Sequence, residues 1–329
     1  MDGTPHLGPC PEVDERACMQ FTRLPYALVV GGANVDLLGV SDAALTHADS
    51  NPGRIFESPG GVGRNIAENL ARLGVRTSLI TAFGDDAHGR WLREECVTDG
   101  IDIGDSVIVD DVPGSRYLAI SGADGDMALA LNDMRALAAV TPALLAASAE
   151  LISRAGVVIA DTNLPHETLR WLTEHCTAPL IVDPVSVAKS PRMLGLLRRV
   201  HALKLNALEA GVLLGRQVDS HDDAAAANAA RELVGAGVQR VFLTRGSAGV
   251  TAADEREVVA LPRPDVTVAN VTGAGDAFTA GVAFATLAGA DLRECAMAGS
   301  TMAGLALMSQ RTVSEAVTSA ALIPLIKEL

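Results

Sequence analysis

The stretch ALVVGGA, at residues 27–33, is a short apolar run that ends in glycines, as a buried strand does when it enters a turn. Four apolar residues downstream recur at the spacing of one helix face, namely Val62, Ile66, Leu70 and Leu73. Gly74 is a natural C-terminal stop for this helix, and the apolar run at residues 76–81 predicts another strand. The order strand, helix, strand indicates a βαβ unit, in which the two strands are parallel.

The same alternation continues along the chain. Further apolar strands are expected at residues 156–161, 180–183, 201–205 and 241–244, with helical patterns between them. Since the crossover helices of a parallel sheet cover both of its faces, the sequence predicts a three-layer α/β/α fold with a mostly parallel central sheet. No linker divides this alternation, so residues 25–329 are expected to form one domain.

Two segments depart from this pattern. Residues 37–58 contain the turn formers DSNPG and few helical signals, and residues 106–132 read as alternating strands joined by ADGD. We expect the two segments to form a small β-lid beside the main sheet. Ligands of open α/β sheets bind at the carboxyl ends of the strands, so a lid in that place would close a binding site.

The composition excludes several classes of protein. The 329 residues contain 26 Lys and Arg against 40 Asp and Glu, and the net charge of −14 argues against a nucleic-acid polymer as the partner. The five cysteines are widely spaced without a CxxC pair, which argues against disulfides or zinc and favours a reducing, cytoplasmic location. The sequence contains no run of about 20 apolar residues, so it predicts no membrane span. The acidic, proline-containing residues 1–24 read as a disordered tail rather than a signal peptide.

The strongest local motif is NVTGAGD at residues 270–276, directly before an apolar helical run. Backbone N–H groups at a glycine-rich helix start can point at an anion, where the helix dipole adds positive potential. Asp276 would lie in the first turn, and a carboxylate there suits a general base that deprotonates a hydroxyl attacking a phosphoryl group. A glycine turn with an Asp that stabilises the helix start explains the same pattern.

Two further glycine clusters lie at helix or strand junctions, PGGVGRN at residues 59–65 and TRGSAG at residues 244–249. Neither matches GxGxxG or GxxxxGK[ST], so a dinucleotide-binding oxidoreductase and a P-loop enzyme lose their main support. Three such glycine junctions in one α/β chain favour a ligand that carries several phosphates.

Two polar pairs follow predicted strands. Asn34 and Asp36 share one side of an extended chain, so they suit either a grip on vicinal sugar hydroxyls or a polar strand end. Asn206 and Glu209 share one face of a helix, where Glu209 suits either a magnesium ion held through water or a helix cap.

The ordered set of motifs resembles the ribokinase-like carbohydrate kinases of the phosphofructokinase B family, from about residue 27 to the C-terminus. The segments PGGVGRNIAENLARLG and NVTGAGDAFTAG carry this resemblance, with NALE and TRGSAG between them. It implies a ribokinase-like fold with a lid, and phosphorylation of a small alcohol by ATP with Mg²⁺.

The resemblance also implies a role for each motif residue. Asp276 would be the base, and the anion hole would be formed by Gly273, Ala274 and Gly275. The sugar would be held by Asn34, Asp36, Gly61 and Asn65. The ATP side would be lined by Asn206, Thr244, Gly246, Gly249 and Ser300, with Glu209 tied to Mg²⁺.

Other segments resemble one branch of the family, which phosphorylates the 5′-hydroxyl of a nucleoside; they are DSNPGR at 49–54, NDM at 132–134 and VDPVS at 182–186. The candidates for contacts with the base are Asn132, Asn163, Ser50 and Arg116. Asn270 and Val271 stand where the generic family more often has Asp and Thr, which departs from the pattern of its monovalent cation (K⁺) site. The resemblance further implies a homodimer formed through the lids. The alternatives are another nucleoside or sugar kinase of the family, or a non-catalytic ligand-binding protein of this fold.

Overall fold

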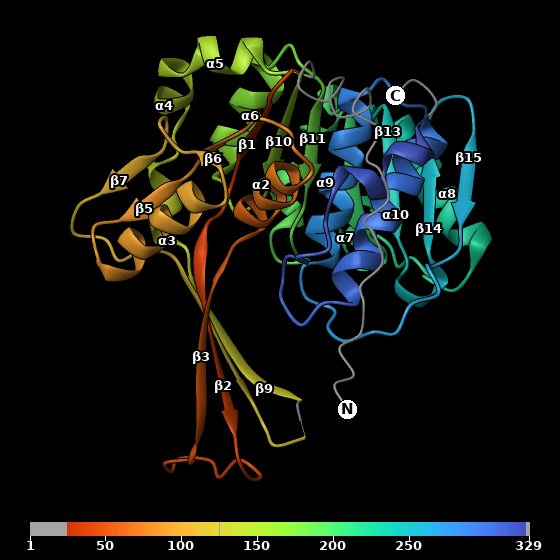
Figure 1. The fold of residues 1–329 in the computed structure, drawn as a ribbon. Coiled ribbons are helices and arrows are strands. Elements are labelled where there is room, and N and C mark those ends of the chain that lie inside the picture. Colours follow the sequence, from red (N-terminus) through yellow and green to blue (C-terminus); the bar gives the residue numbers. More distant parts are fainter. Residues whose placement is uncertain (1–24, 125, 327–329) are drawn as a thin grey trace, which may run out of the picture.

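The computed structural model describes residues 25–124 and 126–326, so the expected tail at residues 1–24 lies outside the described residues. The main body is built on a nine-stranded sheet (Figure 1). Its strands in spatial order are β15 (Val258–Leu261), β14 (Val250–Ala253), β13 (Arg240–Thr244), β12 (Ala202–Asn206), β11 (Leu180–Asp183), β10 (Val157–Asp161), β1 (Ala27–Val30), β4 (Thr77–Ile80) and β6 (Ile101–Asp102). All neighbours from β6 to β13 are parallel, and β14 and β15 extend the sheet in antiparallel fashion.

Each central strand is buried on both faces, because its side chains alternate between two hydrophobic cores. In β1, Ala27 and Val29 belong to one core, while Leu28 and Val30 belong to the other. The first core is covered by α2 (Val62–Arg72), α3 (Ala87–Thr98), α9 (Ala274–Leu287) and α10 (Leu292–Leu307). The second is covered by α4 (Pro142–Ala147), α5 (Ala149–Arg154), α6 (His166–His175), α7 (Ala207–Leu214) and α8 (Asp223–Gly235). The predicted three-layer α/β/α fold with a mostly parallel sheet is therefore confirmed.

A second, four-stranded sheet projects away from the main body, towards the bottom of Figure 1. Its order is β3 (Gly53–Gly60), β2 (Asn34–Ser41), β8 (Arg116–Ser121) and β9 (Met127–Asp133). Strand β2 pairs antiparallel with β3 and parallel with β8, and β8 pairs antiparallel with β9. We call this sheet the lid.

The lid strands differ from the expected segments 37–58 and 106–132 at their boundaries. Strand β2 begins at Asn34 and β3 continues to Gly60, so the expected segment was too short at both ends. The residues before β8 lie outside the lid, because β7 (Val107–Val109) pairs in parallel with β5 (Ala82–Gly84). Val107 and Val109 pack against the second core of the main body, which holds β7 there.

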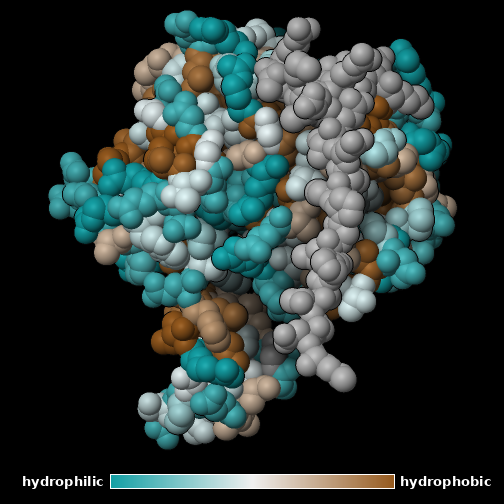
Figure 2. Space-filling view, in the orientation of Figure 1, coloured by the Kyte–Doolittle hydropathy of each residue, from teal (hydrophilic) through white to brown (hydrophobic). Residues whose placement is uncertain are grey.

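The pairing register divides the lid side chains between two faces. Asp36 is paired with Tyr117, and Tyr117 with Asn132, so these three residues share one face. The opposite face carries Glu57, Arg116 and Asp133 near the main body, and further out it is apolar, with Leu37, Ile55, Leu118, Ile120, Leu129 and Leu131. Ile55 and Leu131 are exposed. Figure 2 shows hydrophobic side chains gathered on the lid where it leaves the main body.

Among the described residues, no helix combines the length and apolar character that crossing a membrane would need.

Candidate active site

Polar groups gather at one edge of the main sheet, where the parallel strands end. Gly31 and Gly32 follow β1, and the last residues of the next four strands are Asp161, Asp183, Asn206 and Thr244. The first turns of α2 and α9 reach the same edge, because Asn65 and Asp276 form a hydrogen bond there. This is the edge at which open α/β sheets bind ligands.

The start of α9 holds Asp276 in its first helical turn. Gly273 is the residue immediately before the helix, and its φ is 82°. A Cβ at this position would lie 2.1 Å from the Thr312 carbonyl oxygen, so glycine is required. Asn65 Nδ2 donates a hydrogen bond of 2.8 Å to Asp276 Oδ2. Burial, and then the charge of Asp183, raise the pKa of Asp276 to about 7, against the opposing effects of Asn65 and Lys204. A carboxylate with this pKa can accept a proton near neutral pH.

A buried cation lies below this helix start. Lys204 Nζ is 3.1 Å from Asp183 Oδ2, and the Thr279 hydroxyl donates to the same oxygen over 3.0 Å. A Cβ on Gly275 would lie 2.6 Å from that ammonium group, which places Lys204 directly beside the anion-hole segment. Burial lowers the pKa of Lys204, but nearby carboxylates, Asp183 foremost, outweigh it and leave the pKa above its ordinary value. Lys204 is therefore charged. Sequence reasoning missed it, although a lysine inside the apolar strand HALKL was a signal.

The proposed sugar-binding residues are brought together where the lid joins the main body. Asn34 Nδ2 donates to Asp36 Oδ1 over 2.6 Å, and burial raises the pKa of Asp36 to about 6. Gly61 has φ 99°, and a Cβ there would lie 2.5 Å from the Gly32 carbonyl oxygen. The two glycine segments therefore touch, and this contact sets Asn34 and Asp36 beside the start of α2.

Asn163 lies two residues after the end of β10. Its backbone N–H and that of Gly32 donate to the two carboxylate oxygens of Asp161, each over 2.7 Å. Lys189 donates to the Asn163 side-chain oxygen, and burial lowers the pKa of Lys189. Sequence reasoning missed Asp161 and Lys189; a carboxylate at the end of the apolar strand VVIAD was a signal for the first, and Lys189 had none.

The lid contributes Asn132 to the same side as Asp36, as the register requires. Arg116 was also expected to contact a base, but its register places it on the opposite face with Val35 and Asp133. Its guanidinium forms an ion pair with Asp86, in the loop before α3. Arg116 therefore anchors the lid to the body instead of facing the site.

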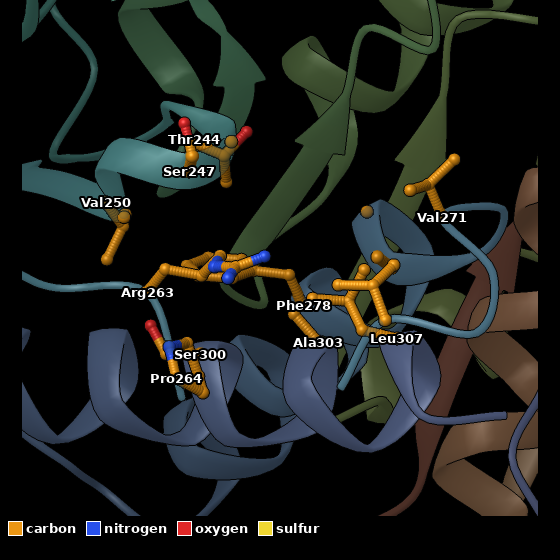
Figure 3. Close-up of a pocket in the computed structure, with 15 residues that line it drawn as sticks. Thr244, Ser247, Val250, Arg263, Pro264, Val271, Phe278, Ser300, Ala303 and Leu307 are labelled. Atoms are coloured by element: carbon orange, nitrogen blue, oxygen red, sulfur yellow. The ribbon is translucent and has the colours of Figure 1, made fainter. Parts of the chain in front are cut away.

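A cavity of about 310 Å³ lies beside the start of α9. It is lined by four of the residues expected on the ATP side, which are Thr244, Gly246, Gly249 and Ser300. Ala274 and Gly275 of the expected anion hole line it too, and most of the other walls are apolar, with Phe278, Val250 and Leu307 among them. Figure 3 shows Arg263, which sequence reasoning missed, extending into the cavity. A mostly apolar cavity with a glycine-rich end suits a nucleotide base with its phosphates.

Asn206 and Glu209 form a capping box at the start of α7. The Asn206 backbone N–H donates to Glu209 Oε2 over 2.8 Å, and the Glu209 N–H donates to Asn206 Oδ1 over 2.9 Å. Glu209 is 3% exposed. Burial raises its pKa, against the opposing charge of Lys204. The structure thus places Glu209 in a helix cap, and the described part of the chain holds no cluster of three or more His, Cys, Asp or Glu that would bind a metal ion.

Asp276 lies between the cavity and the Asn34–Asp36 pair. Its neighbour Gly275 lines the cavity, while its hydrogen-bond partner Asn65 belongs to the helix that begins beside Asn34 and Asp36. Residues 24–318 match the pfkB family carbohydrate kinases. The chain belongs to the pfkB family.

Two relatives and one solved structure place this pfkB member more closely. It is 36% identical to "Pseudouridine kinase" of Escherichia coli K12, over 92% of this chain and 96% of that protein. It is 37% identical to an "Uncharacterized sugar kinase" of the same organism, over 84% of this chain and 76% of that protein. Its fold matches the structure of Arabidopsis thaliana ribokinase complexed with ribose and ATP, with a TM-score of 0.79 and 22% identity. The match covers 92% of this chain and 99% of the ribokinase chain. This agreement confirms the ribokinase-like fold.

Proposed function

We propose that this pfkB kinase transfers the γ-phosphoryl group of ATP to the 5′-hydroxyl of pseudouridine, which gives pseudouridine 5′-phosphate and ADP. The observation that carries the chemistry is the Asp276 carboxylate, with a pKa of about 7, between the nucleotide cavity and the Asn34–Asp36 pair. The choice of pseudouridine rests on the similarity to the E. coli pseudouridine kinase along nearly the whole of both chains.

The cavity would take ATP, with the base among its apolar walls and the phosphates at the start of α9. The N–H groups of Gly273, Ala274 and Gly275 are the donors for the transferred phosphoryl group, and Lys204 adds a fixed positive charge beneath them. The capping box engages Glu209, so these residues suit a magnesium ion that is carried on the ATP phosphates and reaches the protein through water. Magnesium would neutralise phosphate charge.

The acceptor would be held by Asn34, Asp36, Gly61 and Asn65. Asn65 occupies Asp276 Oδ2, so Oδ1 is the oxygen that takes the proton from the 5′-hydroxyl. The hydroxyl oxygen forms a bond to the γ-phosphorus, the bond from that phosphorus to the β–γ bridging oxygen breaks, and ADP leaves with the bonding electrons. Closure of the lid would exclude water, which would otherwise compete for the phosphoryl group.

Selection between nucleosides must come from groups that face the base, because pseudouridine and uridine share the same ribose. Pseudouridine has a carbon glycosidic link and a free N1–H that uridine lacks. We expect the base to be contacted by the amide groups of Asn132, which lies on the lid, and Asn163, which accepts a hydrogen bond from Lys189. A site that binds this N–H discriminates strongly, since uridine leaves the protein acceptor unpaired.

A second candidate function is the phosphorylation of another nucleoside or of a free sugar, which the similarity to the E. coli sugar kinase favours. The experiment is an ADP-release assay with pseudouridine, uridine, adenosine, ribose and fructose 6-phosphate. The proposal expects the highest kcat/KM for pseudouridine. A preference for any other acceptor refutes the substrate assignment, and no acceptor-dependent ADP release refutes the kinase reaction.

We also propose a cytoplasmic homodimer. The apolar lid face, with Ile55 76% and Leu131 59% exposed, suits a second copy of the same face. The cysteines within the described residues, Cys96, Cys176 and Cys295, are free thiols, which supports a reducing compartment.

A further inference from the structure

Arg64 is a buried cation that the phosphoryl transfer does not use directly. It lies in the first turn of α2 and is 2% exposed. Its Nη2 is 2.7 Å from Glu68 Oε2 and 2.9 Å from Asp99 Oδ2, and Asp99 is the residue that ends α3. The two carboxylates fix the guanidinium from one side and balance its charge.

The other guanidinium nitrogen of Arg64 points towards the active site. Nη1 donates to Asn65 Oδ1 and to the Pro59 carbonyl oxygen, each over 3.2 Å. Pro59 belongs to the lid strand β3. One side chain thus joins the end of a lid strand to the amide that contacts Asp276.

The contact with Asn65 decides which end of its amide faces the carboxylate. An amide has a donor end and an acceptor end. Because Arg64 donates to Oδ1, the Nδ2 end is directed at Asp276 Oδ2, 2.8 Å away. A reversed amide would direct its oxygen at the Asp276 carboxylate, which has no hydrogen to donate. Its NH₂ group would face the Arg64 guanidinium, which has no acceptor. Arg64 therefore penalises the reversed orientation.

We propose that Arg64 is a positioning residue, which directs the Asn65 amide at Asp276 and ties that orientation to the lid strand β3. The role rests on the proposed function in that Asp276 is taken as the base. The pKa of Asp276 also responds to the charges of Asp183 in β11, Asp161 in β10 and Lys204 in β12. These charges act on Asp276 without Arg64. The groups around Arg64 itself are Glu68, Arg72, Cys96, Asp99 and Asp36.

The test compares the pH profiles of kcat/KM for the wild type and Arg64→Lys. Lysine keeps the charge beside Glu68 and Asp99 but loses the second arm that reaches Asn65 and Pro59. Asp276 works as a base when it is deprotonated, and the Asn65 hydrogen bond lowers its pKa. Loss of that bond should therefore move the acid limb to higher pH, by about one pH unit. An unchanged acid limb would overturn the proposal.

Arg72→Lys is the matched control. Arg72 contacts the same Glu68 over 2.8 Å and lies 4.0 Å from Asp99, yet among the described residues it forms no hydrogen bond to Asn65 or Pro59. This variant should keep the acid limb of the wild type even if its melting temperature falls. An equal shift in both arginine variants would show a general effect of the charge cluster and would contradict a specific role for Arg64.

Asn65→Ala provides a second route, because it removes the intermediary and leaves the Arg64 ion pairs in place. It should shift the acid limb in the same direction, and the double variant should shift it no further. Additive shifts would overturn the proposal.

A crystal structure of Arg64→Lys gives a readout that does not depend on activity. The Asn65–Asp276 hydrogen bond should be lost, and its persistence at the original distance would contradict the proposal. The pH profiles use whichever acceptor the assay identifies, so a wrong substrate assignment is recognised separately from a wrong role for Arg64.

Discussion

Asp276 carries the proposed chemistry, and its replacement by asparagine separates catalysis from binding. Asp276→Asn keeps the size of the side chain and an oxygen that can accept from Asn65, but an amide cannot take up the hydroxyl proton. Turnover should fall by about 10²–10⁴-fold, while the ATP dissociation constant stays close to that of the wild type. Steady-state kinetics and calorimetric ATP titration measure the two quantities. Turnover near the wild-type value would disprove the assigned role.

The same substitution should raise stability at high pH. A carboxyl whose folded pKa is about 7, against about 3.9 in an unfolded chain, binds an extra proton in the folded state. Its contribution to stability is therefore present below about pH 4 and is lost as pH rises from there to about 7. Asp276→Asn avoids this loss, so its melting temperature should exceed that of the wild type by several degrees at pH 8. The difference should shrink near pH 5, where Asp276 is protonated; a constant difference would contradict the raised pKa.

The pH dependence of the wild-type enzyme should show two carboxyl groups. With pKa values of about 7 for Asp276 and about 6 for Asp36, log kcat/KM should fall with slope one just below pH 7 and approach slope two below pH 6. Asp36→Asn should keep slope one throughout, at lower overall activity. A wild-type profile that is flat between pH 5 and 8 would be inconsistent with both pKa values.

Sequence reasoning found the residues that lie in short motifs and missed those whose partners are distant in the chain. Asp276, Asn65, Asn34 and Asp36 were all predicted, because glycine turns and strand ends mark them. Arg64 and Lys204 were not, since their positions depend on Asp99, Asp183 and the start of α9, which only tertiary folding brings near. For Glu209 the sequence suited either a magnesium ion or a helix cap, and the structure shows it in a helix cap.

At the scale of elements, the loop between β13 and β14 forms part of the wall of the cavity proposed to take ATP. Arg245 follows β13 and is buried; its guanidinium contacts Asp223 Oδ1 at the start of α8 over 2.6 Å and the Ala248 carbonyl oxygen over 3.1 Å. These contacts hold the segment that contains Gly246 and Gly249 against α8. Arg245 is thus expected to shape the cavity without lining it.

Arg245→Met should raise the KM for ATP by roughly tenfold, equivalent to about 1.4 kcal/mol, with a smaller effect on the KM of the acceptor. Arg216→Met is the control, because Arg216 forms an exposed ion pair with Glu232 at the other end of α8, and such pairs contribute little. Equal values of KM for ATP in the wild type and Arg245→Met would show that the loop holds its shape without this anchor.

The element boundaries show where a sequence pattern is sufficient. The six predicted strands of the main sheet match β1, β4, β10, β11, β12 and β13, because a buried parallel strand is a continuous apolar run between polar ends. The lid boundaries were less accurate. The run VIV at residues 107–109 has the composition of a lid strand, and its pairing with β5 depends on packing that alternation of residues cannot reveal.

At the scale of the whole molecule, the apolar face of the lid should form the dimer interface. The wild type should have twice the chain mass in light scattering, and Leu131→Asp should have the mass of one chain, because two charges would face each other across the interface. Val97→Asp, on the exposed side of α3, is the control and should remain a dimer. A monomeric wild type, or a dimeric Leu131→Asp, would contradict this arrangement. The sequence predicted the lid but not which of its faces carries the exposed apolar side chains.

The central claim is that this pfkB kinase phosphorylates pseudouridine, and the ratio of kcat/KM for pseudouridine to that for uridine tests it most directly. The two nucleosides share the ribose that we propose Asn34, Asp36 and Asn65 to hold, so the ratio isolates recognition of the base. We expect a ratio of at least about 100, and Asn132→Ala should lower it while leaving ATP binding unchanged. Equal kcat/KM for the two nucleosides, or a higher value for ribose, would contradict the claim.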